Sequence, residues 1–192
     1  YNDYVYRPIM AKAEEEVAAR ISNMLHRDKL PYMGDLDDEI DKQQSEMGFV
    51  FAEEQRHAIQ TALTSPISII SGGTGTGKTS IQRAILNIYK KAFPDSDVVC
   101  CAPTGRAARR MEQSTGFPAS TIHKALNLTA GELHELKDLQ LLEADLVLVD
   151  EVSMMDMITT WCLFNALPPG CRLILVGDAD QLPSVGPGAV LN

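Results

Sequence analysis

Hydrophobic residues recur at helical spacing in the first part of the chain. After Pro8, apolar side chains stand three or four positions apart, at Met10, Ala13, Val17, Ile21 and Leu25. This spacing predicts an amphipathic helix over 10–25, which Pro31 ends at the latest. A more polar helix is predicted over 36–47, with Asp35 as its N-cap and Gly48 at its end. We expect residues 1–47 to form a small helical appendage.

From about residue 48 the pattern changes to short, unbroken apolar runs that alternate with helical segments. The predicted strands cover 67–70, 98–102, 146–149 and 172–176. The predicted helices cover 53–63, 77–92, 105–114 and 154–167. Strands that are apolar on both faces are typical of a parallel sheet covered by helices on both sides. The sequence therefore predicts a doubly wound α/β domain over 48–192, with ligands at the carboxyl ends of the strands.

One segment, 127–142, fits two patterns. Residues 127–134 are consistent with two very short strands around an Ala-Gly turn. Leucines spaced by three also fit a helix, at Leu133, Leu136, Leu139 and Leu142. The pattern leaves both a small hairpin insertion and a helix open.

The charge of the chain is acidic overall but unevenly distributed. The net charge of −9 argues against a protein that binds nucleic acid through its overall field. Residues 102–124 nevertheless carry four bases against one acid, a net +3. Such a basic segment can still bind phosphates. Within it, we expect Arg109 and Arg110 to form a solvated helix face.

The four cysteines and the hydropathy exclude several protein classes. No Cys-x-x-Cys pair and no Cys/His cluster with zinc spacing occurs, so buried free thiols in a reducing, cytoplasmic compartment are predicted. No apolar run approaches 18 residues, so no membrane segment is expected. The chain begins at Tyr1 rather than Met and ends in a polar loop, from which we expect a piece of a longer protein.

The segment GGTGTGKT, residues 72–79, fits the phosphate-binding pattern G-x-x-x-x-G-K-[ST]. Its glycines let backbone N–H groups turn toward a polyphosphate, and the following helix points its positive end at the same anion. Lys78 would reach the β and γ phosphates, and the Thr79 hydroxyl would bind Mg²⁺. A glycine-rich turn with a chance lysine is the alternative, but a strand and a helix flank this motif. The predicted nucleotide contacts are Gly73, Thr74, Gly75, Thr76, Gly77, Lys78, Thr79 and Ser80.

Two acids follow the predicted strand 146–149. Asp150 is placed to hold Mg²⁺, through a water molecule, and Glu151 to orient and deprotonate an attacking water. In the alternative interpretation, both carboxylates only cap a helix that begins at Val152. Their occurrence downstream of a phosphate-binding motif favours the catalytic interpretation.

The loop after the predicted strand 172–176 holds a further candidate, Gln181. Its amide can donate to a phosphate oxygen and accept from water, so it could sense whether the γ phosphate is present. Asp178 and Asp180 in the same loop are expected to have structural roles, such as hydrogen bonds to the loop backbone. The predicted catalytic set is therefore Lys78, Asp150, Glu151 and Gln181.

Six segments occur in an order that resembles the superfamily 1 helicases. They are FAEEQRHAI, GGTGTGKT, APTGRAA, TIHK, DEVSMMD and VGDADQLPSVGPG. The residues of these segments resemble those of the RecD-like branch, which comprises the alpha subunit of exodeoxyribonuclease V and its stand-alone bacterial relatives. The resemblance covers residues 50–190 and implies a first RecA-like motor lobe. Residues 1–47 resemble more loosely the helical region that precedes the motor in the stand-alone relatives.

The resemblance also implies ligand contacts. Gln55 would recognise adenine, with Arg56 assisting, although an ordinary exposed glutamine at a helix start is the alternative. Contacts to single-stranded DNA would come from Thr104, Gly105, Arg106, Thr121 and His123. A strand-tip arginine and helix N-terminal amides suit a phosphate backbone, and a histidine can stack on a base.

The implied activity is ATP- and Mg²⁺-dependent 5′-to-3′ movement along single-stranded DNA, in recombination and repair. Chemistry would lie between two lobes, and the second lobe, with its arginine, is missing from this sequence. Nuclease-complex subunits are possible partners, and a hairpin at 127–142 would act as a wedge at the fork. The alternatives are a non-catalytic nucleotide-binding module and an ATPase with no DNA role.

Overall fold

A computed structural model describes residues 8–28, 32, 34–128 and 139–178. Its helices are α1 (Pro8–Leu25), α2 (Leu36–Met47), α3 (Glu53–Thr64), α4 (Lys78–Ala92), α5 (Gly105–Thr115), α6 (Ile122–Ala125), the 3₁₀ turn η3 (Val152–Met154) and α7 (Met157–Ala166). Its strands are β1 (Ile67–Ser71), β2 (Val98–Ala102), β3 (Ala119–Thr121), β4 (Leu146–Val149) and β5 (Arg172–Gly177).

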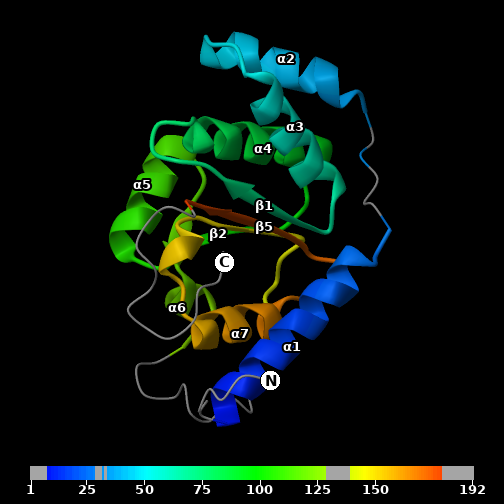
Figure 1. The fold of residues 1–192 in the computed structure, drawn as a ribbon. Coiled ribbons are helices and arrows are strands. Elements are labelled where there is room, and N and C mark those ends of the chain that lie inside the picture. The colour runs from blue at the N-terminus through cyan, green and yellow to red at the C-terminus, as the bar shows by residue number, and fades with distance from the viewer. Residues whose placement is uncertain (1–7, 29–31, 33, 129–138, 179–192) are drawn as a thin grey trace.

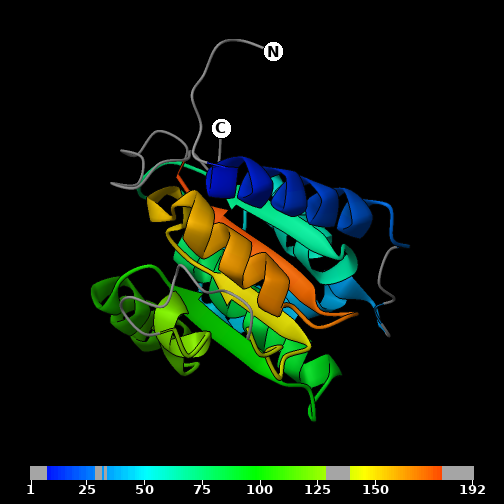
Figure 2. The ribbon, with the colours of Figure 1, turned by 90° about the horizontal axis from the view of Figure 1, so that it is seen from below.

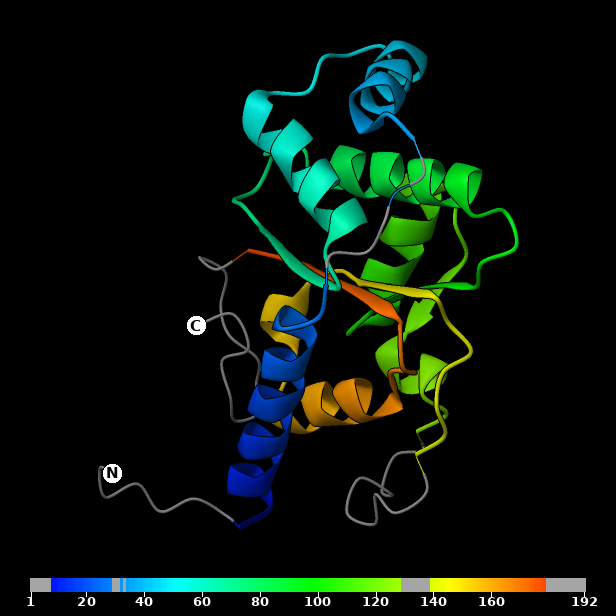
Figure 3. The same cartoon turned by 90° about the vertical axis from the view of Figure 1, so that its right-hand side faces the viewer.

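The five strands form one sheet in the order β1-β5-β4-β2-β3, and every neighbouring pair is parallel. Helices α2, α3 and α4 cover one side of the sheet, and α1 and α7 lie on the other (Figure 1). Seen from the side in Figure 3, the sheet again lies between these two helical layers. The predicted α/β fold is therefore confirmed.

The alternation of side chains along each strand explains the unbroken apolar runs. Val147 and Leu173 face the layer of α1 and α7, where they join one hydrophobic cluster. Leu148 and Ile174, one position later, join a second cluster with residues of α3 and α4. Because both faces of the central strands are buried, neither set of positions can be polar.

The two N-terminal helices pack on opposite faces of the sheet. Helix α1 lies beside α7 (Figure 2). Between them, the Trp161 indole N–H donates to a Glu16 carboxylate oxygen at 2.5 Å. Helix α2 packs on α3 and α4, and Lys91 of α4 pairs with Glu39 at 2.6 Å. The N-terminal helices thus add to the two cores of the lobe, and a domain boundary near residue 47 remains a prediction.

The structure contains short elements that the sequence pattern did not predict. Strand β3 and helix α6 together span only 119–125, and a segment of this length is too short to show a hydrophobic period. The predicted helix over 154–167 begins later, because η3 ends at Met154 and Asp156 caps α7 by accepting from the Thr159 N–H at 2.7 Å.

The segment 127–142 lies mostly outside the described residues, and so does the predicted wedge hairpin. Its described end, 139–142, is not helical, so the alternative of a helix extending through Leu139 and Leu142 is wrong there. Leu142 instead donates its backbone N–H to the Ala166 carbonyl at 2.8 Å.

All four cysteines are buried and none forms a disulfide. Burial raises the pKa of Cys100, Cys101 and Cys171 to about 12 and that of Cys162 to about 11, so these thiols stay protonated and unreactive near neutral pH. Within the described part of the chain, no helix has both the length and the apolar character needed to cross a membrane.

Truncating a core side chain at the centre of the sheet should reduce stability. Leu148 is fully buried, so Leu148→Ala is expected to lower the free energy of unfolding by about 3 kcal/mol, through lost burial and the cavity that remains. Leu25→Ala is the matched control, because Leu25 is 66% exposed and should change stability by less than about 0.5 kcal/mol. Denaturant unfolding measures both, and equal losses would contradict the assignment of the core.

Candidate functional site

The phosphate-binding segment connects β1 to α4 and depends on two glycines. Gly75 and Gly77 both have φ of +81°, a left-handed conformation that other residues adopt only at a cost. A Cβ on Gly77 would also lie 2.6 Å from the Gln55 amide nitrogen. The positive φ therefore favours glycine at position 77, and a larger residue would also displace the Gln55 amide.

The Lys78 ammonium lies within the turn of this loop. It donates to the Gly73 carbonyl oxygen at 2.8 Å and to the Gly72 carbonyl oxygen. These backbone acceptors hold the cation at the position where a polyphosphate would enter. Phosphate oxygens carry full negative charge and would be stronger acceptors than the two carbonyls.

A cavity of about 300 Å³ opens beside this loop at the carboxyl edge of the sheet. Its lining residues come from the loop after β1, from helices α4 and α5, and from the ends of β4 and β5: Thr74, Gly75, Thr76, Gly77, Lys78, Thr79, Gln82, Arg110, Asp150, Glu151, Gly177 and Asp178. The fold thus brings together the predicted cation, the hydroxyl and the two acids. Gln55, Gly73 and Ser80 do not line the cavity, and Gln181 lies outside the described residues.

Gln55 connects the start of α3 to the phosphate-binding loop. Its amide nitrogen donates to the Thr76 carbonyl at 2.9 Å, and its amide oxygen accepts from the Ala52 N–H at 2.9 Å. Arg56 is instead held by α2, through Asp37 at 2.9 Å and Asp41 at 2.5 Å. The interpretation that Arg56 assists at the nucleotide is not supported by these contacts.

The two acids leave β4 in a constrained turn. The Asp150 N–H donates to the Cys101 carbonyl at 2.9 Å, and the Glu151 N–H donates to an Asp150 carboxylate oxygen at 2.9 Å. Glu151 has φ of 54° and ψ of 40°, the left-handed region that is costly for a residue with a Cβ. This strain is held at a residue whose side chain lines the cavity, as is common at functional sites.

The donor set at the cavity fits a divalent magnesium ion. The Thr79 hydroxyl and the Asp150 carboxylate are both hard oxygen donors and line the same cavity. The loop around Lys78 can accept phosphate oxygens beside them. Mg²⁺ is usually held by one or two protein oxygens together with phosphates and water, and this site offers such a set.

Arg110 lies on the predicted solvated helix face, and it makes an ion pair that the sequence did not predict. One of its guanidinium nitrogens lies 2.9 Å from a Glu151 carboxylate oxygen, so the two form an ion pair. Arg109, the preceding residue, is exposed and makes no ion pair with any described residue. Nothing in the sequence distinguishes these two arginines, because only the placement of β4 beside β2 brings Glu151 within reach of α5.

Sequence reasoning missed a further residue of the cavity, Gln82. Its side chain is 1% exposed, and neither of its amide atoms has a hydrogen-bond partner among the described residues. A buried amide without a partner is costly, so it suits a ligand that can supply hydrogen bonds. The available signal was a glutamine at a buried position of α4, next to Ile81. Asp178, expected to be structural, is also buried in the cavity wall.

The predicted DNA contacts lie at two neighbouring strand ends. Thr104 follows β2 and caps α5, where its hydroxyl accepts from the Ala107 N–H at 3.2 Å. Thr121 ends β3, pairs in register with Ala102 of β2, and caps α6. The unpredicted strand β3 therefore places Thr121 and His123 beside the Thr104 turn.

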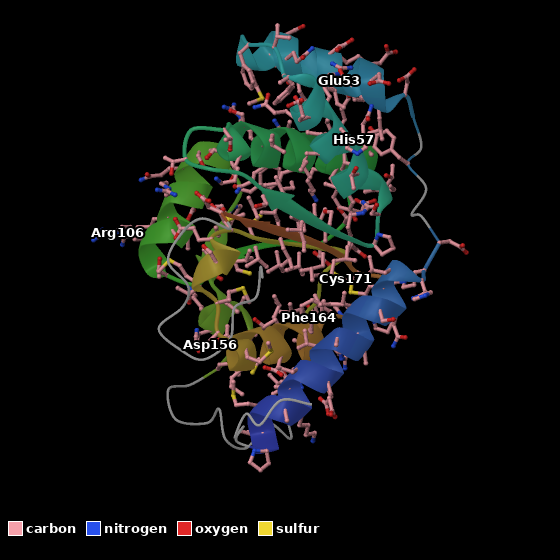
Figure 4. All side chains as sticks on the ribbon, in the orientation of Figure 1. Glu53, His57, Arg106, Asp156, Phe164 and Cys171 are labelled. Carbon is pink, nitrogen blue, oxygen red and sulfur yellow. The ribbon has the colours of Figure 1, made fainter. Side chains whose placement is uncertain are left out.

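A second cavity, of about 370 Å³, adjoins these strand ends. It is lined by Thr104, Arg106, Ala107, Arg110, Glu151 and Met154. Arg106 projects away from α5 at the edge of the molecule (Figure 4). Gly105, Thr121 and His123 do not line this cavity. Of the predicted DNA contacts, Thr104 and Arg106 are thus in one hollow, and Thr121 and His123 lie on the next strand end.

Comparisons with known proteins identify the family. The AAA domain family matches residues 55–187. An ATP-dependent RecD2 DNA helicase of Deinococcus radiodurans is 36% identical over 97% of this chain and 25% of its own length. The RecBCD enzyme subunit RecD of Haemophilus influenzae is 39% identical over 72% of this chain and 25% of its own length.

Among solved structures, the Pif1 helicase from Candida albicans superposes with a TM-score of 0.50, at 23% identity, over 71% of this chain and 34% of that one. This likeness concerns the fold. The chain spans about a quarter of the length of the two curated relatives. The matched motifs, the parallel sheet and the sequence identity all agree, and the chain therefore belongs to the AAA domain family and, within it, to the RecD-like helicases of superfamily 1.

Proposed function

We propose that this chain is the first, ATP-binding motor lobe of a DNA helicase that moves 5′ to 3′ along single-stranded DNA in recombination and repair. The observation that carries the proposal is the order of groups along one edge of the sheet. The phosphate-binding loop follows β1, the acids follow β4, and the Thr104 turn follows β2. Nucleotide and DNA groups would thus occupy adjacent positions on one rigid support.

The chemistry that this arrangement supports is hydrolysis of the γ phosphate. A water oxygen attacks the γ phosphorus, the bond to the bridging oxygen of ADP breaks, and the Glu151 carboxylate takes the proton of the water. Lys78 would exchange its carbonyl acceptors for β and γ phosphate oxygens and so offset their charge. Gln181 would contact the γ phosphate from the loop after β5. Gln55 would bind adenine by exchanging its contacts to Thr76 and Ala52 for the base.

Thr79 and Asp150 would hold Mg²⁺ in this proposal, with Asp150 acting through a water molecule. The bound ion supplies charge neutralisation at the β and γ phosphates. The side-chain amide of Gln82, which lacks a described partner, is available to hydrogen-bond the nucleotide or its water shell.

The DNA-binding part of the proposal is supported by the second cavity and the local charge. Thr104, Gly105 and Arg106 would contact the backbone phosphates, and Thr121 and His123 would contact the next part of the strand. The names of the relatives in Deinococcus radiodurans and Haemophilus influenzae support a DNA substrate and, for a RecBCD-like assembly, nuclease subunits as partners. A cytoplasmic location is proposed because the four cysteines are buried free thiols, as is usual in a reducing compartment.

We further propose that a second lobe completes the site. Transition-state stabilisation in such motors needs a cation opposite the phosphate-binding loop, and the resemblance places it on a second RecA-like lobe. The chain by itself is therefore expected to bind Mg²⁺ and nucleotide, to hydrolyse ATP slowly, and not to unwind a duplex. Efficient duplex unwinding by residues 1–192 alone would contradict the proposal that a second lobe is required.

Replacing the loop lysine should abolish catalysis. Lys78→Ala in the full-length helicase is expected to lower ATP turnover by at least about 100-fold, because the phosphates lose their cation. Steady-state phosphate release with and without oligonucleotide measures the effect. Lys12→Ala is the control, since Lys12 is exposed on α1, away from the cavity. Turnover that survives Lys78→Ala would remove the basis for the nucleotide site.

Removing the base should separate binding from hydrolysis. Glu151→Gln is expected to lower turnover by about 100-fold or more while nucleotide affinity stays within a few fold, because the carboxylate acts on water rather than on ATP. Fluorescent-nucleotide titration and single-turnover hydrolysis measure the two quantities. Glu112→Gln, an exposed change on α5, should alter neither. An unchanged single-turnover rate in Glu151→Gln would rule out Glu151 as the base.

Replacing the exposed arginine at the second cavity should weaken DNA binding without altering nucleotide affinity. Arg106→Ala is expected to reduce affinity for oligonucleotides of different sequence alike, and to lower the salt dependence of binding by about 0.7 for each phosphate that the arginine no longer neutralises. Fluorescence anisotropy over a range of salt concentrations measures both. Arg83→Ala on the exposed face of α4 is the control. An unchanged affinity and salt dependence in Arg106→Ala would remove Arg106 from the DNA contact, and a wild type that binds no oligonucleotide would favour the alternative of an ATPase with no DNA role.

A further inference from the structure

The ion pair between Arg110 and Glu151 forms part of the wall between two cavities. Both residues line the cavity beside the phosphate-binding loop, and both also line the cavity that contains Thr104 and Arg106. No other residue is shared by these two linings. The pair is therefore the point at which the nucleotide site and the candidate DNA site touch.

The geometry of the pair directs the catalytic carboxylate toward α5. An Arg110 guanidinium nitrogen donates to Glu151 Oε1 at 2.9 Å. Because Glu151 is fixed in a left-handed turn, its side chain starts from a constrained backbone position. A carboxylate oxygen that accepts from Arg110 is oriented toward the guanidinium, whereas proton abstraction requires it to face the attacking water.

Arg110 is also placed to respond to DNA. It lies four residues after Arg106 in the same helix, so both side chains project from the same face of α5 into one cavity. Its side chain is 73% exposed, against 22% for Glu151, so water and ions can reach the pair. Exposed ion pairs contribute little free energy, and a phosphate can offer the guanidinium a bidentate alternative.

We propose that Arg110 is a positioning residue that couples DNA binding to ATP hydrolysis. Without DNA, Arg110 restrains Glu151. When the phosphate backbone of a single strand enters the cavity of Thr104 and Arg106, Arg110 pairs with a phosphate and releases Glu151 to face the attacking water. This inference rests on the proposed function and adds the residue through which the two sites communicate.

The test measures ATP turnover of the full-length helicase with and without a single-stranded oligonucleotide, for wild type and Arg110→Ala. Arg110→Ala is expected to raise the DNA-free rate about 1.4- to fivefold, the factor that corresponds to an exposed ion pair of about 0.2–1 kcal/mol. The ratio of DNA-stimulated to DNA-free rate should fall accordingly. Arg110→Lys, which keeps the charge, should restore much of the wild-type ratio.

Arg109→Ala is the matched control, because it removes the same charge from the same helix without breaking the ion pair. It should leave the ratio of stimulated to DNA-free rate at the wild-type value. A purely structural role of Arg110 would be seen as equal losses in both rates together with a lower unfolding temperature, and would overturn the proposal. So would an unchanged DNA-free rate in Arg110→Ala, combined with a higher oligonucleotide concentration for half-maximal stimulation, since Arg110 would then only bind DNA.

Failure of the proposed function gives a different result. If DNA fails to stimulate ATP turnover by the wild type, both the DNA-binding part of the proposed function and the coupling through Arg110 are wrong. If Lys78→Ala retains turnover, the nucleotide site itself is wrong. A wild type that is stimulated and depends on Lys78, beside an Arg110→Ala variant with unchanged rates, would overturn the coupling alone.

Discussion

The parallel arrangement of the strands is the constraint on which the site depends. Because all five strands run in one direction, their carboxyl ends meet at one edge, and each chemical group follows a different strand. The order β1-β5-β4-β2-β3 arranges these groups as glycine-rich loop, Asp178, the acids Asp150 and Glu151, Thr104 turn and Thr121 turn. A different strand order would separate the same residues without changing any motif.

The rigidity of that edge comes from burial on both sides of the sheet. Val147 and Leu148, adjacent in β4, are both fully buried, one in each hydrophobic cluster. Strand β4 therefore has little freedom to shift, and its packing fixes the backbone position of Asp150 and Glu151, which follow it. The left-handed backbone at Glu151 is tolerated because this surrounding packing determines it.

Several polar contacts connect elements that are distant in the chain. They differ in how readily their partners can be exchanged. Gln55 is held on both sides of its amide by backbone groups, which ties α3 to the phosphate-binding loop. The Arg110–Glu151 pair is largely exposed and is easily exchanged for another anion. Fixed contacts around the loop and an exchangeable contact at the acids together suit a site that must keep its shape while responding to a second ligand.

Local signals were enough to predict the sheet class, four of the five strands and the glycine-lysine loop, because unbroken apolar runs and a spaced motif do not depend on distant residues. The sequence could not reveal β3, which is three residues long, or distinguish Arg110 from Arg109, since both are exposed arginines on one helix. It also gave no reason to expect that Gln82 would be buried without a partner at the cavity. These points depend on how segments that are distant in the chain pack together, and hydrophobic periodicity does not encode that packing.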